Sequence, residues 1–82
     1  MYLEIVTPDQ KVFAGEVVAA RFPGTAGSFQ VLDHHAPLIS TLDRGRIVLR
    51  TANQAEQTIT VDGGVVEVNN NKVTVLAEAV IG

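Results

Sequence analysis

Apolar and polar residues alternate with a period of two along most of this chain. The segment 56–62 shows the pattern, with Ile59 and Val61 alternating with Thr58 and Thr60. Because successive side chains of a strand point to opposite faces, we expect Ile59 and Val61 to lie inward and the threonines outward. Valine dominates the aliphatic residues, and its branched Cβ suits a pleated sheet better than a helix. The pattern therefore predicts strands almost everywhere.

Turn-forming residues divide the alternating segments into short strands. Proline lacks the donor of a sheet ladder, and glycine and asparagine reach the left-handed conformation that tight turns need. We expect Gly63–Gly64 to form one tight turn and Asn69–Asn71 another. The predicted strands are 2–6, 11–13, 16–22, 27–32, 38–42, 46–51, 56–62, 65–68 and 73–81. This spacing predicts an all-β fold, an antiparallel β-sandwich or flattened barrel of about ten short strands, in a single domain over residues 1–82.

Composition excludes several classes of function. The chain has 82 residues, 46% of them hydrophobic, so it has enough apolar surface for one thin core. Its net charge of −3 gives no general attraction to nucleic acid or anionic lipid, and the absence of cysteine excludes disulfides and thiolate nucleophiles. The segment 1–4 does not resemble a signal peptide, and no apolar run is long enough to cross a bilayer. We expect any membrane association to be through another protein.

Catalytic and ligand-binding motifs are not evident. His34 and His35 are adjacent, so on extended chain they point to opposite sides and do not readily share a metal ion, and Asp33 is beside them rather than facing them. Acidic residues are scattered, and the glycines of segment 24–27 are followed by neither a lysine nor a helix, as a phosphate loop requires. We predict no catalytic residues, no cofactor site and no metal site, and therefore no enzyme activity of its own.

One cluster of charge is present in the sequence. Arg44, Arg46 and Arg50 are three of the six basic residues, and their even spacing places them on one face of a strand. The cluster is either a solvated outer face or a patch for an acidic partner surface. Nucleic acid is disfavoured because the same strand has no aromatic residue to stack on bases.

Several segments, in order and with natural spacing, resemble one known family. Gly24–Leu32 followed by His35–Leu38 resembles the "G..G.f.vl..HAPL" segment of the epsilon subunit of F-type ATP synthase. The other similar segments are 3–8 with 12–15, the turn 42–45, and the closing pair 63–68 and 73–78. Together they cover nearly all of the chain. The resemblance implies a ten-stranded β-sandwich.

The resemblance also implies a function in the central stalk, or rotor, of a proton-translocating ATP synthase. The epsilon domain of this family binds the gamma subunit and the ring of c subunits, and it helps to couple proton flow to ATP synthesis. The implied location is peripheral, on the cytoplasmic face of a bacterial inner membrane, with a thylakoid as the alternative. The family's C-terminal helical hairpin, with its inhibition of ATP hydrolysis and its nucleotide binding, is not expected here, because the sequence ends at Gly82.

Contact residues are carried over from the family position by position. His35, Ser40 and Thr7 match positions that meet the gamma subunit. Ser28, with Phe29 and Asp33, corresponds to the segment that faces the c-ring. Some relatives have an acidic residue at the position of Ser28, so the c-ring contact here is expected to be weaker or to involve Asp33.

Two other readings remain open on the residues alone. A free-standing β-sandwich could bind a carbohydrate or other small ligand, for which it needs an exposed aromatic platform. A small enzyme could use His35 with a carboxylate. The few aromatic residues, Tyr2, Phe13, Phe22 and Phe29, favour neither reading.

Overall fold

The structure, a computed structural model, describes residues 1–81 and is built from strands and turns, with no helix in that range. The strands are β1 (Tyr2–Val6), β2 (Lys11–Glu16), β3 (Ala19–Phe22), β4 (Phe29–Leu32), β5 (Leu38–Arg50), β6 (Glu56–Asn69) and β7 (Lys72–Ala77). They form one sheet in the order β2-β1-β7-β6-β5-β3-β4.

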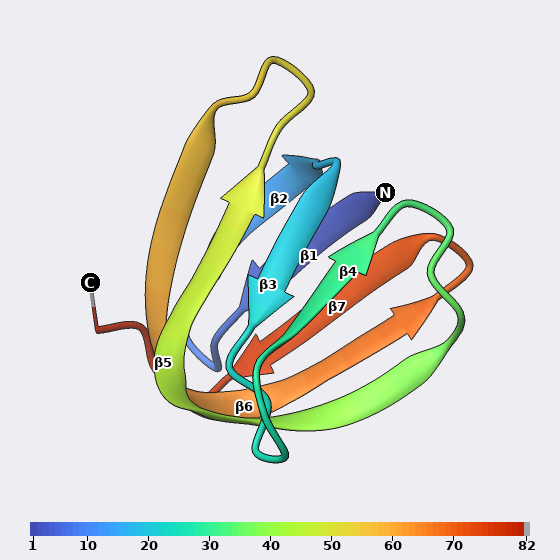
Figure 1. Ribbon diagram of the computed structural model, residues 1–82. Coiled ribbons are helices and arrows are strands. Elements are labelled where there is room, and N and C mark those ends of the chain that lie inside the picture. The colour runs from blue at the N-terminus through green and yellow to red at the C-terminus, as the bar shows by residue number, and fades with distance from the viewer. Residues whose placement is uncertain (82) are drawn as a thin grey trace.

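The sheet folds over on itself because β5 and β6 are long and bend together (Figure 1). These strands have 13 and 14 residues and pair antiparallel along nearly their full length. Their first and second halves therefore belong to different layers. The layer of β2, β1 and β7 continues into the second half of β6 and the first half of β5, and the remaining halves join β3 and β4. The predicted β-sandwich class is confirmed.

The bend in β6 lies at a pair of glycines. Gly63 and Gly64 have φ values of 83° and 149°, which residues with a Cβ rarely adopt. Before them the buried positions are odd-numbered, as in Val61, and after them even-numbered, as in Val66. The ladder with β5 continues on both sides of the bend. The expectation that this pair ends one strand and begins another was wrong, because the glycines let the strand bend without leaving the ladder.

The strand count and pairing differ from the prediction in two respects. Segments 38–42 and 46–51 belong to one strand, as do 56–62 and 65–68, so the described residues hold seven strands rather than about ten. The pairing is also mixed, since β1 runs parallel to β7 while the other pairs are antiparallel. Residue alternation shows which side of a strand is buried but carries no information on the direction of its neighbour.

The core lies between the two layers and is largely aliphatic, as the composition predicts. Ile59 and Val61 are buried while Thr58 is exposed, so the inward face of this segment was predicted correctly. Phe22 is the largest fully buried side chain. The other large side chains that are fully buried are Leu3, Ile5, Ile47, Leu49, Val17, Val31, Val61, Val66, Val68, Val73 and Val75.

The turn between β6 and β7 has the geometry that its asparagines predict. Asn70 and Asn71 have φ values of 53° and 60°, and they alone separate the paired residues Asn69 and Lys72. Positive φ at both central residues is typical of a two-residue hairpin of type I′. This turn lies beside the start of β1, because Tyr2 donates its backbone N–H to the carbonyl of Asn71 at 3.1 Å.

Candidate docking surfaces

The three residues expected to meet a gamma subunit lie around the margin of one layer. Thr7 follows the end of β1, Ser40 lies on β5, and His35 belongs to the loop before β5. Three strand spacings separate β1 from β5 in the order β1-β7-β6-β5, so Thr7 and Ser40 are roughly 15 Å apart at about 4.8 Å per strand. The residues do not form a compact cluster. They lie along the margin of an extended layer, and the side chain of Ser40 is on the same side of β5 as the buried Leu42.

An exposed apolar strip crosses the same layer on its outer surface. Ile39, Val65 and Leu76 are 73%, 38% and 56% exposed. Val65 pairs with Leu76 on one side and with Thr41 on the other, and Ile39 is the diagonal neighbour of Val65. We call these three residues the outer apolar patch. Exposing aliphatic side chains to water is unfavourable. A cluster of them on the surface therefore indicates a site that a partner covers.

Sequence reasoning missed the outer apolar patch, although a signal was present. A strand with one solvated face has polar residues at alternate positions. Leu76 stands between the buried Val75 and Ala77, and Ile39 follows the half-buried Leu38. These breaks in the alternation mark places where both faces of a strand are apolar.

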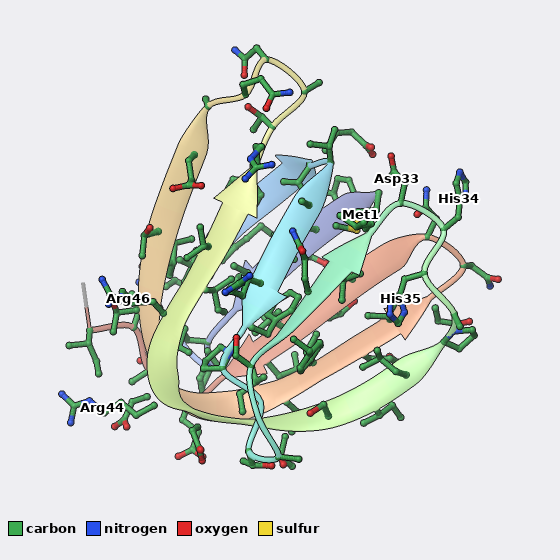
Figure 2. All side chains as sticks on the ribbon, in the orientation of Figure 1. Met1, Asp33, His34, His35, Arg44 and Arg46 are labelled. Atoms are coloured by element: carbon green, nitrogen blue, oxygen red, sulfur yellow. The ribbon has the colours of Figure 1, made fainter. Side chains whose placement is uncertain are left out.

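The two histidines lie in the loop that connects β4 to β5, and their side chains point in different directions (Figure 2). His34 is exposed, has a φ of 62°, and donates its backbone N–H to Oδ1 of Asn71 at 2.7 Å. His35 is half-buried, and its Nδ1 lies 2.7 Å from the carbonyl oxygen of Ala36. Because that oxygen accepts, the proton of the neutral ring is on Nδ1. His35 thus makes the backbone contact expected of a loop histidine.

The three residues expected at the c-ring occupy different environments. Ser28 is exposed just before β4, whereas Asp33 follows the end of β4. The four residues of β4 lie between them, so five steps of extended chain separate them by roughly 16 Å. Phe29 is half-buried, with its ring 5.6 Å from that of Phe22, so it supports the segment from inside. The structure therefore does not bring Ser28 and Asp33 together.

The loop that carries Ser28 is attached to β5 at several points. Thr25 donates its backbone N–H to the carbonyl of Thr41 at 3.0 Å, and the hydroxyl groups of the same two residues are 2.6 Å apart. Asp43 donates to the carbonyl of Pro23 at 2.8 Å. At Gly24 an added Cβ would lie 2.6 Å from the carbonyl oxygen of Gly27. Ser28 is thus presented by a tightly folded loop.

Asp33 is engaged within the domain, near His34 at the same end of the molecule (Figure 2). Its carboxylate accepts a hydrogen bond from the α-ammonium group of Met1, which also donates to the carbonyl of Val17 at 3.1 Å. The hydrogen bond to the ammonium group lowers the pKa of Asp33. The same bond raises the pKa of the Met1 amine, against the opposing effect of burial. The ion pair reduces the free charge that Asp33 can offer to a partner.

The arginines of β5 lie on the outer face of the other layer and at the corner. Arg44, Arg46 and Arg50 are all exposed, and Arg50 has an Nη2 atom 3.8 Å from Oε2 of Glu56. Ile47 and Leu49, between them, are buried, as the spacing predicts. Figure 2 shows Arg44 and Arg46 beside the corner where β5 and β6 bend. At least one of the three charges is already paired within the domain.

Other kinds of site find little support in the described residues. No group of three or more His, Asp or Glu side chains within 1–81 is arranged to hold a metal ion. Phe22 is fully buried and Phe13 and Phe29 are packed against the core, which leaves Tyr2 as the exposed aromatic residue of that range. A carbohydrate platform is therefore not formed there. Nor does this part of the chain contain a helix that could span a membrane.

Comparison with known proteins gives consistent matches. Residues 1–82 match the family described as ATP synthase, Delta/Epsilon chain, beta-sandwich domain. An ATP synthase epsilon chain of Chlorobium limicola is 40% identical over 78 residues, which are 95% of this chain and 89% of that protein. That of Maridesulfovibrio salexigens is 45% identical over 78 residues, 95% of this chain and 54% of the relative. The chain thus spans most of one relative and about half of the other.

Solved structures share the fold. A chain in the mitochondrial ATP synthase of Euglena gracilis, in a structure of OSCP, F1 and the c-ring, superposes with a TM-score of 0.90. It is 20% identical, and the match covers 96% of this chain and 51% of that one. A chain from the central stalk and c-ring of the Tetrahymena thermophila mitochondrial ATP synthase gives a TM-score of 0.81 at 15% identity, over 98% and 64% of the two chains.

Proposed function

This chain belongs to the ATP synthase delta/epsilon chain family, matched over the β-sandwich domain, and on that premise we propose that it is a rotor subunit of the central stalk. In this role it binds the gamma subunit and rests on the c-ring, so that proton flow is coupled to ATP synthesis elsewhere in the complex. It is a non-catalytic subunit of a membrane-associated complex. We place it on the cytoplasmic face of a bacterial membrane.

The observation that carries the gamma contact is the outer apolar patch. Ile39 is 73% exposed, and the patch lies on the layer whose margin holds Thr7 and Ser40. Burying exposed aliphatic side chains against a partner removes their contact with water, at about 25 cal/mol per Å². A stiff β-sandwich is also suited to transmit torque, because a closely packed core resists deformation. The patch supports a docking face on the outer surface of this layer, with Thr7, Ser40 and His35 at its margin. The side chain of Ser40 lies on the same side of β5 as the buried Leu42, so it would meet a partner at the edge of the layer rather than within the patch.

We assign the c-ring contact to the loop that carries Ser28. This loop is exposed and is fixed to β5 through the Thr25–Thr41 contacts, so it can present hydrogen-bonding groups without first becoming ordered. Phe29 supports it from the core side. Asp33 lies at the other end of β4 and is paired with Met1, so we do not include it in the same contact.

The test is binding of the gamma subunit from the same organism by an outer-face variant. Ile39→Asp places a charge in the outer apolar patch without touching the core, so the domain stays folded and its affinity for gamma should fall at least tenfold, which corresponds to about 1.4 kcal/mol. Thr58→Asp introduces the same charge at an exposed position of the other layer and should leave the affinity unchanged. Equal affinities for wild type, Ile39→Asp and Leu76→Asp would refute the assignment of this face.

A further inference from the structure

Asn71 makes two hydrogen bonds to two separate segments of the chain. Its backbone carbonyl accepts the N–H of Tyr2 at 3.1 Å, and its side-chain Oδ1 accepts the N–H of His34 at 2.7 Å. Tyr2 begins β1, whereas His34 lies in the loop that leads from β4 to β5. A single residue of the β6–β7 hairpin therefore contacts both the start of β1, which also pairs with β7 along its length, and this loop.

The loop is also attached to the domain through the ion pair of Asp33 with Met1, and its backbone conformation at His34 is unfavourable. His34 has a φ of 62°, a region that non-glycine residues occupy at a cost unless their surroundings hold them there. The turn that contains His34 is closed by the N–H of His35, which donates to the carbonyl of Leu32 at 3.2 Å. The bond to the Asn71 side chain is thus the contact made by the N–H of His34 itself, and it adds to the turn bond in stabilising the left-handed backbone immediately before His35.

The turn requires positive φ at residues 70 and 71 but not the side chain of Asn71, as a comparison with Asn70 shows. Both residues have positive φ, 53° and 60°, which glycine or asparagine can supply. Asn70 is exposed, and its side chain makes no hydrogen bond within residues 1–81, whereas that of Asn71 holds His34. The two neighbouring asparagines therefore both supply positive φ to the turn, but only the side chain of Asn71 bonds to the loop. That difference supplies a matched control.

We propose that Asn71 is a positioning residue that fixes the His34–His35 loop, and with it the His35 ring, for contact with the gamma subunit. The half-buried His35 ring is held in turn by its contact with the carbonyl of Ala36. The part of this inference that concerns gamma rests on the proposed function. The part that concerns the loop is a property of the domain alone, so each has its own measurement.

The experiment compares Asn71→Gly with Asn70→Gly in the whole chain. Both substitutions keep the turn, because glycine accepts positive φ, but only the first removes the acceptor for His34. In Asn71→Gly, amide hydrogen exchange of His34 should rise about fivefold, as expected for the loss of one hydrogen bond. The Tyr2 amide should exchange as in wild type, because its acceptor is the backbone carbonyl. Asn70→Gly should change neither amide.

A third variant tests whether the acceptor oxygen is responsible. Asn71→Asp keeps an oxygen in place of Oδ1 and tolerates the left-handed backbone, so His34 should again be protected. Affinity for gamma should fall about two- to fivefold in Asn71→Gly, because fewer molecules hold the loop in place, and should recover in Asn71→Asp.

The outcomes separate the two parts of the inference. Unchanged His34 exchange in Asn71→Gly, or an equal rise in Asn70→Gly, would overturn the positioning of the loop. Faster His34 exchange with undiminished affinity for gamma would overturn its role in docking. If wild type itself does not bind gamma, the proposed function fails, and the exchange data still decide whether Asn71 positions the loop.

Discussion

At the scale of single residues, the α-ammonium group of Met1 is surrounded by groups that favour its charged form. It donates to Asp33 and to the carbonyl of Val17, and Glu16 lies 3.5 Å away. These contacts join the start of β1 to the end of β4. The pKa of Asp33 is lowered and that of the Met1 amine is raised, so the two shifts affect stability in different ranges of pH.

We predict that the Met1–Asp33 pair stabilises the domain over a limited range of pH. The pKa of Asp33 is lowered from 3.8, so its contribution is present above that value and is lost as pH falls through the folded pKa. The pKa of the Met1 amine is raised from 8.0, so its contribution is present below that value and is lost as pH rises through the folded pKa. Asp33→Asn should therefore be least stable, relative to wild type, between these limits.

Urea unfolding of the chain with a free Met1 amine checks this prediction. The midpoint difference between wild type and Asp33→Asn should be largest near about pH 6 and smaller near about pH 3 and 10. Asp9→Asn, at an exposed turn, provides a control without a contact to the amine. A difference that is the same at all three pH values would contradict the role of the ion pair.

At the scale of elements, the corner of β6 depends on Gly64. Its φ of 149° and its position beside β7 both exclude a side chain, since an added Cβ would lie 2.4 Å from the carbonyl oxygen of Leu76. We predict that Gly64→Ala destabilises the domain by about 2–4 kcal/mol, because the backbone of β6 or β7 must shift. Thermal or urea unfolding measures the change.

A second glycine in a strand gives the matched control. Gly15 of β2 has no positive φ, and an added Cβ would meet only the Phe13 ring, at 3.6 Å, which is an ordinary contact. Gly15→Ala should therefore change stability by less than about 1 kcal/mol. Similar losses at Gly15 and Gly64 would show that the corner geometry is not what makes Gly64 necessary.

Local sequence predicts some features of the strands and turns and leaves others ambiguous. Alternation identified the buried faces of segments such as 56–62, and the asparagines identified the β6–β7 turn. The glycine pair at 63–64 is ambiguous locally, because the same residues permit a chain-reversing turn and a bend within a strand. The continuous pairing of β6 with β5 shows that the glycines form a bend rather than a chain-reversing turn. That pairing joins residues remote in the chain.

For the whole molecule, stability depends on a thin core around one large side chain. Phe22 is fully buried, and we predict that Phe22→Ala costs about 3–5 kcal/mol through lost burial and the cavity that remains. Ile39→Ala, at a side chain that is 73% exposed, should change the free energy of unfolding by less than about 0.5 kcal/mol. Urea unfolding of both variants provides the comparison. A comparable loss at Ile39 would mean that the outer apolar patch belongs to the folding core rather than to a docking face.

The sequence by itself determined the β-sandwich class, the inward faces of its strands and, through ordered motifs, the family. These depend on residue periodicity and on local turn chemistry, which neighbouring residues encode. Only the tertiary structure decided that β1 pairs parallel to β7 and that Ile39, Val65 and Leu76 form one strip. The physical reason is that strand order, register and the corner in β6 bring distant segments together, and no local pattern specifies which strands become neighbours.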